Sequence, residues 1–145
     1  MKPIVHSAAV HPIKLSSRNS ELPQELKVTK WMNKDINRMD AIEFFVNIIN
    51  QTECLKASEA LNMTVDFYGK NNINGRPIVF CTDGGFIEPG NSGTPAITTY
   101  ERGSVVGLLS RGPTEVVALP NIFVDIQAFF HQLPEYEDDF LAFHT

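Results

Sequence analysis

The sequence predicts an all-β fold, in which short antiparallel strands form a closed or nearly closed β-barrel with one internal helix and one C-terminal helix. Two observations predict it. Apolar and β-branched residues occur in many short runs separated by Gly, Asn and Pro, and two segments are best explained as helices. The 145 residues are 43% hydrophobic and 20% charged, which is typical of one globular domain with its own core.

The first elements follow a polar segment, residues 16–25, that we expect to be a surface loop. Residues 26–31 alternate apolar and polar side chains, as a half-buried strand does. Residues 41–49 are rich in β-branched and aromatic side chains and predict a second strand, although a short buried helix fits their periodicity equally well. Residues 50–62 predict a helix that Thr52 can cap.

The second half of the chain predicts further strands and a terminal helix. Residues 69–76 are dense in Asn and Gly and form a turn region. The expected strands are residues 77–81, 96–100, 105–109, 116–119 and 122–124, with a hairpin turn at 101–103. Asp125 can cap a helix running to His131, and its apolar face comprises Ile126, Phe129, Phe130 and Leu133.

Composition excludes several classes of function. A net charge of −5 argues against nucleic acid as a partner. The acidic residues gather in 135–145, which we expect to be a solvated tail. No apolar run reaches the roughly 20 residues of a membrane span, so we expect no membrane contact, and the first residues show no signal peptide. No Cys/His spacing suggests a metal site, and we expect no cofactor.

The two cysteines, Cys54 and Cys81, allow one disulfide or two free thiols. Two N-glycosylation sequons begin at Asn50 and Asn62. A pair of cysteines together with two sequons favours an oxidising, secreted setting, in conflict with the missing signal peptide.

The segment Gly90-Asn91-Ser92-Gly93-Thr94-Pro95 carries the clearest chemical signal. Flanking glycines let the chain turn sharply, so that a serine hydroxyl can stand clear of the backbone and nearby N–H groups can hold an oxyanion. A glycine-rich turn between strands is the alternative interpretation. An α/β-hydrolase elbow fits poorly, because that motif is Gly-x-Ser-x-Gly followed by a helix.

The order of these features resembles the C-terminal barrel of the chymotrypsin/trypsin-like serine peptidases. Residues 2–15 resemble the connector between the two barrels of that fold, residues 26–31 the strand that ends at a buried Trp, and Gly90-Asn91-Ser92-Gly93 the nucleophile loop. Deg-type and glutamyl-type peptidases have a similar loop and the same double-barrel fold. The resemblance implies a six-stranded barrel over residues 26–134, after a connector and loop at 1–25 and before the tail at 135–145.

The resemblance also implies roles for individual residues. Ser92 takes the nucleophile position, and the Gly90 N–H belongs to the oxyanion hole. Cys54 and Cys81 would form a disulfide. The residues implied in substrate binding are Phe86, Ser110, Arg111, Gly112 and Asn121. The substrate would be a peptide or protein, and the setting extracellular.

Departures from the family pattern put activity in doubt. The general base and its orienting Asp would precede these residues, and we expect His6, His11, His131 and His144 to be surface or packing residues. The family usually has an Asp before the serine, which receives the new N-terminus on activation, and here it is Asn91. Three hypotheses follow: part of a secreted serine endopeptidase, a non-catalytic homologue that binds a protein partner, or a nonfunctional remnant.

Overall fold

The computed structural model describes residues 5, 7, 12–35, 38–60, 64–70, 72, 75–84, 90–100, 102–111 and 120–138. For residues 33–35 and 111 it describes the backbone only. The strands are β1 Lys14–Leu15, β2 Glu25–Asp35, β3 Arg38–Ile49, β4 Val79–Thr82, β5 Pro95–Thr98, β6 Ser104–Arg111 and β7 Asn121–Asp125. The helices are α1 Gln51–Glu59 and α2 Ile126–Gln132. The strand expected at residues 116–119 lies outside the described residues.

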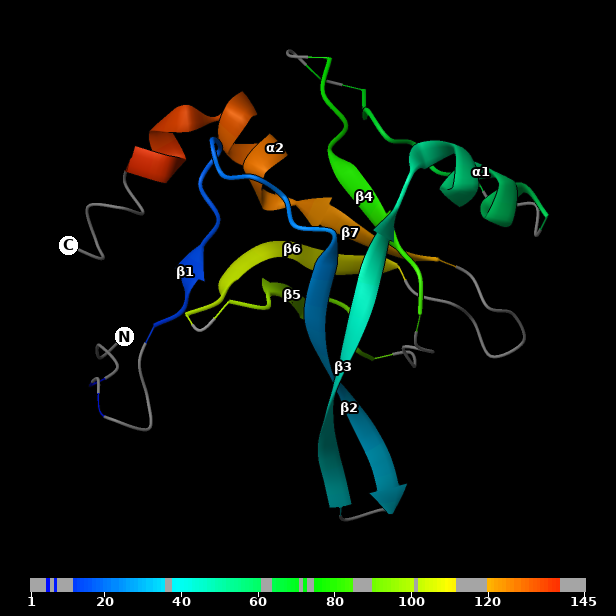
Figure 1. Ribbon diagram of the computed structural model, residues 1–145, viewed down its shortest axis with the longest axis vertical. Coiled ribbons are helices and arrows are strands. Elements are labelled where there is room, and N and C mark those ends of the chain that lie inside the picture. The colour runs from blue at the N-terminus through cyan, green and yellow to red at the C-terminus, as the bar shows by residue number, and fades with distance from the viewer. Residues whose placement is uncertain are drawn as a thin grey trace.

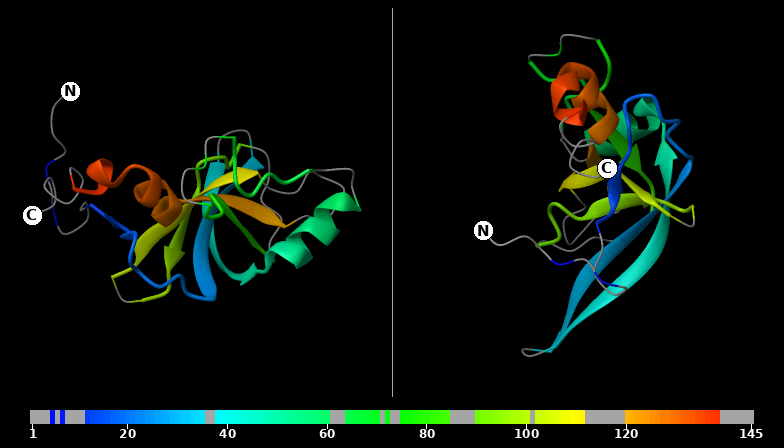
Figure 2. Two further views of the ribbon diagram at one scale, coloured as in Figure 1. Left: turned by 90° about the horizontal axis from the view of Figure 1, so that it is seen from above. Right: turned by 90° about the vertical axis from the view of Figure 1, so that its left-hand side faces the viewer.

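Six antiparallel strands close into a barrel, which confirms the predicted fold class. The order around it is β6-β5-β2-β3-β4-β7, and β7 returns to pair with β6. β1 is an extra strand, paired in parallel with the start of β6. Helices α1 and α2 lie on either side of this barrel in Figure 1 and in the left view of Figure 2.

The barrel interior is filled by alternate side chains of its strands. The buried cluster comprises Leu26, Val28, Val46, Phe80, Ala96, Val106, Leu109 and Phe123. The rings of Phe80 and Phe123 stack, with centroids 5.4 Å apart. A Cβ on Gly107 would lie 2.7 Å from the Phe80 ring, so this strand position must be glycine for the aromatic pair to fit.

β2 and β3 extend well beyond the barrel as a twisted hairpin (Figure 1). β5 pairs with β2 only from Leu26 to Val28, whereas β3 pairs with β2 as far as Asp35. Residues 41–49 therefore form a strand rather than a helix, and this strand begins earlier than expected, at Arg38. Trp31, which the family resemblance expected to be buried, lies on the projecting half, and 53% of its surface is exposed.

Both predicted helices form, but the capping residue of α1 and the buried face of α2 differ from the prediction. Asn50 rather than Thr52 caps α1, because its side chain accepts a hydrogen bond from the Glu53 N–H. Asp125 caps α2 as predicted, through the N–H groups of Gln127 and Ala128. Phe129, expected on the apolar face, is exposed, because α2 packs on the barrel mainly through Ile126 and Phe130.

The expected solvated tail is wrong in its first part. Residues 134–138 form a helical turn, and the Glu137 side chain is buried. Its carboxylate lies 3.1 Å from Arg18 Nε and accepts a hydrogen bond from the Arg18 backbone N–H. Gln127 Nε2 donates to Ser16 Oγ and to the Ser20 carbonyl, each at 2.8 Å. The segment before β2 is therefore held against α2 and the turn that follows it.

Candidate functional site

The loop that carries Ser92 is a turn fixed by backbone hydrogen bonds. The Thr94 N–H donates to the Asn91 carbonyl at 3.0 Å and closes the turn. The Gly93 N–H donates to the Leu109 carbonyl, and the Leu109 N–H to the Thr94 carbonyl, each at 2.8 Å. These bonds fix the loop on β6 and leave Ser92 exposed at its tip.

The two glycines of this turn are required by backbone conformation rather than by space. Gly90 has φ 97° and Gly93 has φ 85°, in the region that L side chains rarely adopt. A Cβ added at either position would meet nothing within 4 Å. The sequence argument for a sharp turn around Ser92 is therefore confirmed in its geometry.

Asn91 binds this turn to β2. Its Oδ1 accepts from the Trp31 N–H at 2.7 Å, and its Nδ2 donates to the Trp31 carbonyl at 3.2 Å. This is the two-bond exchange of a hydrogen-bonded residue pair in an antiparallel sheet, made here by a side chain where β5 no longer pairs with β2. Asn91 is almost fully buried, so a neutral amide holds the loop where the family usually has a carboxylate.

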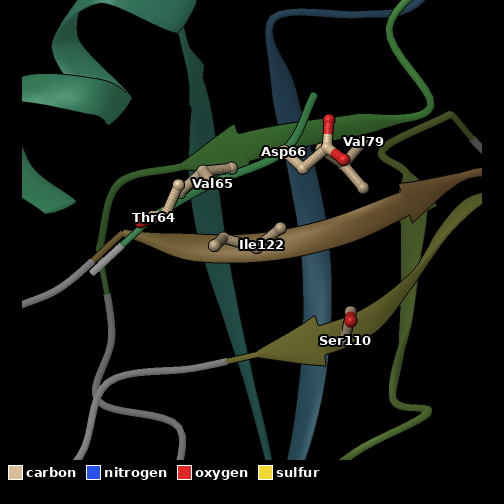
Figure 3. A pocket seen from close by; sticks show the side chains of 6 residues that line it. All are labelled: Thr64, Val65, Asp66, Val79, Ser110 and Ile122. Carbon is tan, nitrogen blue, oxygen red and sulfur yellow. The ribbon is translucent and has the colours of Figure 1, made fainter. Parts of the chain in front are cut away.

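The candidate substrate residues that can be placed lie at the same end of the barrel. Ser110 is exposed on β6, directly after the Leu109 that binds the loop, and Arg111 follows it as the last residue of the strand. Phe86 and Gly112 lie outside the described residues. Ser110 also lines a hollow of about 130 Å³ on the outer side of β4, β6 and β7, together with Thr64, Val65, Asp66, Val79 and Ile122 (Figure 3).

Asn121 is fully buried at the start of β7. Its Nδ2 donates to the Gly84 carbonyl at 3.0 Å, with longer contacts to Thr82 Oγ1 and the Asp83 carbonyl. Among the residues that the structure describes, its Oδ1 is buried and has no hydrogen-bond partner. Asn121 therefore links the start of β7 to the residues that follow β4, and its side chain is not accessible to solvent.

Among the described residues, no side-chain base is hydrogen-bonded to the Ser92 hydroxyl. His131 is the one histidine of the four that they include, and its Nε2 lies 2.8 Å from the Arg18 carbonyl and next to Arg76 Nη1. Burial raises the pKa of Asp125, while hydrogen bonds from two α2 N–H groups act in the opposite direction. That carboxylate caps α2, so neither group is part of the serine loop.

The cysteines form a disulfide that joins α1 to β4. The bond links Cys54 and Cys81 across 27 residues and lies in a second buried cluster with Val65, Phe67 and Ile122. The alternative of two free thiols is therefore excluded. Within the described residues no group of three or more His, Cys, Asp or Glu could hold a metal ion, and none of the described helices is long and apolar enough to cross a membrane.

The sequence patterns did not indicate two long-range contacts, of which the one between Asn91 and Trp31 holds the serine loop in place. Trp31 contributes its backbone rather than its ring, across 60 residues from Asn91. Arg18 and Glu137 meet across 119 residues. No local signal could have found either pair, because both arise from tertiary packing.

Comparison with known proteins places these features in one family. A family model described as Trypsin matches residues 2–132. Among solved structures, the chain is similar to the scabies mite inactivated protease paralogue S-I1, with a TM-score of 0.62 and 15% sequence identity. The match covers 86% of this chain and 52% of that one, so these residues span about half of its length. No curated protein matches the chain.

Proposed function

The chain belongs to the trypsin family, and we propose that it forms the half of a serine endopeptidase domain that carries the nucleophile. The observation that supports this most directly is the exposed Ser92 on a turn that three backbone hydrogen bonds fix in place. A nucleophilic serine needs this combination, because its hydroxyl must reach a substrate carbonyl without a change in the loop.

In the proposed reaction the Ser92 hydroxyl attacks the carbonyl carbon of a peptide bond. Its proton passes to a general base, and the negative charge on the substrate oxygen is held by the backbone N–H groups of Gly90 and Ser92. The substrate chain would run beside the end of β6, at Ser110 and Arg111. The one described histidine, His131, belongs to α2, and its Nε2 lies 2.8 Å from the Arg18 carbonyl oxygen. The proposal therefore places the base outside the described residues.

The setting of this reaction is extracellular. Membership of the trypsin family together with the Cys54–Cys81 disulfide indicates an oxidising compartment. We propose in addition that the protein is secreted and that it hydrolyses a peptide or protein substrate.

A second candidate function is a non-catalytic homologue that binds a protein partner. Asn91 favours it, because a neutral amide bound to the Trp31 backbone cannot form the ion pair that the family uses in activation. Under this proposal the same loop is a rigid surface and Ser92 performs no chemistry.

A fluorophosphonate probe distinguishes the two. The protein isolated from its own source is treated with the probe, and the peptide that contains Ser92 is examined by mass spectrometry. We expect modification at Ser92 for the endopeptidase, with trypsin as a positive control. An unmodified Ser92 peptide beside fully labelled trypsin would reject the endopeptidase and support the binding protein. Recombinant chain and its Ser92→Ala variant give the background rate.

A further inference from the structure

We propose that Asn50 is an N-glycosylation site of the folded protein. Asn50 begins the sequon Asn50-Gln51-Thr52, whose middle residue is not proline. It is exposed at the junction of β3 and α1, and the Thr52 side chain is exposed as well. This site is separate from the serine loop, and nothing in the proposed peptidase chemistry uses it.

The two polar atoms of the Asn50 amide have different surroundings. Oδ1 accepts a hydrogen bond from the Glu53 N–H at 2.9 Å and caps α1. Within the part of the chain that the structure describes, no hydrogen bond uses Nδ2. An N-linked sugar is attached to Nδ2 and leaves Oδ1 in place as an acceptor. The glycan and the helix cap therefore use different atoms and do not compete.

Transfer of the glycan to Asn50 needs one co-reactant, a lipid-linked oligosaccharide diphosphate. A bond forms between Asn50 Nδ2 and the anomeric carbon of the sugar. The bond from that carbon to the diphosphate oxygen breaks, the lipid diphosphate leaves, and one amide proton is lost to base. No oxidant or reductant takes part.

The disulfide beside this site supports the proposal independently. The Cys54 N–H donates to the Asn50 carbonyl at 3.0 Å, so the sequon and the disulfide share the first turn of α1. Disulfides form in the same secretory compartment in which sequons are glycosylated. Glycosylation of Asn50 depends on the proposed extracellular setting and not on the activity of Ser92. An inactive Ser92 would therefore not contradict the glycosylation site, and an unglycosylated Asn50 would not contradict the peptidase.

Two matched variants test the site in the full chain, expressed behind a signal peptide in a eukaryotic cell. Asn50→Asp keeps a capping oxygen and removes the acceptor nitrogen, because Asp and Asn cap helices about equally well. Thr52→Ala keeps Asn50 and its cap but destroys the sequon. We expect each variant to lack one glycan of the parent chain by intact mass and to unfold at the same temperature as the deglycosylated parent.

The readout must separate this sequon from the one at Asn62, which lies outside the described residues. Peptide-N-glycosidase F converts an occupied Asn to Asp, so the peptide that contains residue 50 reports its own occupancy. Both secreted chain and chain retained in the endoplasmic reticulum are analysed. An unconverted Asn50 in both fractions, with disulfide-bonded Cys54 and Cys81, would overturn the proposal.

Discussion

Replacing Asn91 tests how the serine loop is held. Asn91→Ala removes two hydrogen bonds to the Trp31 backbone, at 2.7 and 3.2 Å. A net contribution of roughly 0.5–1.5 kcal/mol for each bond predicts a loss of about 1–3 kcal/mol in the free energy of unfolding. The loss from these two bonds is the same at acidic and neutral pH, because both bonds join neutral groups.

Asn91→Asp, which restores the residue usual in the family, behaves differently. One carboxylate oxygen keeps the bond from the Trp31 N–H, but the other then faces the Trp31 carbonyl oxygen, and two acceptors repel. The site is almost fully buried, so the pKa of the introduced carboxyl is raised in the folded state above its unfolded value near 3.9. A protonated carboxyl donates to the Trp31 carbonyl and restores both bonds.

The sign of the pH dependence follows from this raised pKa. The folded Asn91→Asp variant binds more protons than its unfolded chain, so its stability is greatest at low pH and falls as the pH rises through the folded pKa. Urea unfolding at about pH 4 and about pH 7 measures it, relative to the parent and to Asn91→Ala. An Asn91→Asp profile parallel to that of the parent would refute the role given to the Nδ2 bond.

Three further predictions concern the framework of the barrel. Replacing Cys54 and Cys81 by Ala together should lower the free energy of unfolding by about 3–4 kcal/mol, because the bond closes a loop across 27 residues; equal urea midpoints would contradict this. Asp125→Asn keeps the α2 cap and removes a carboxyl whose pKa burial raises, so the variant should gain stability over the parent as the pH rises from about 4 to about 7, and parallel profiles would contradict it. Glu137→Ala should speed hydrogen exchange at the Arg18 amide, whose acceptor it removes, and unchanged exchange would show that the contact contributes nothing in solution.

Local sequence patterns predicted the elements whose formation depends on near neighbours. Alternation identified β2, because Leu26 and Val28 face the barrel interior while Lys27 faces outward and lies 3.1 Å from Glu43. A capping residue followed by helical spacing identified α2. The glycine-flanked serine identified the turn, because φ values near 90° are a local requirement.

The errors share one physical origin, which is tertiary packing. Trp31 looked like a core residue, but β2 continues past its pairing with β5 and carries the ring into solvent. Glu137 looked like part of an acidic tail, but Arg18 supplies a charge across 119 residues that lets it be buried. Capping by Asn50 rather than Thr52 depended on where β3 ends, which is decided by its pairing with β4 at Ile48 and Ile49.

The described hydrogen bonds of the serine loop join groups that do not change charge. The bonds from Gly93 to Leu109, from Thr94 to Asn91 and between Asn91 and Trp31 all join neutral amides. In a loop held by an ion pair, a change in pH would alter both the loop and the general base, and the two effects would overlap. Here these bonds persist across the neutral pH range, so under the proposed function a pH dependence in the labelling of Ser92 would report on the general base rather than on these bonds. Under the proposed endopeptidase function, the Asn91 bonds therefore set the shape of the serine loop, and the base that deprotonates Ser92 decides its activity.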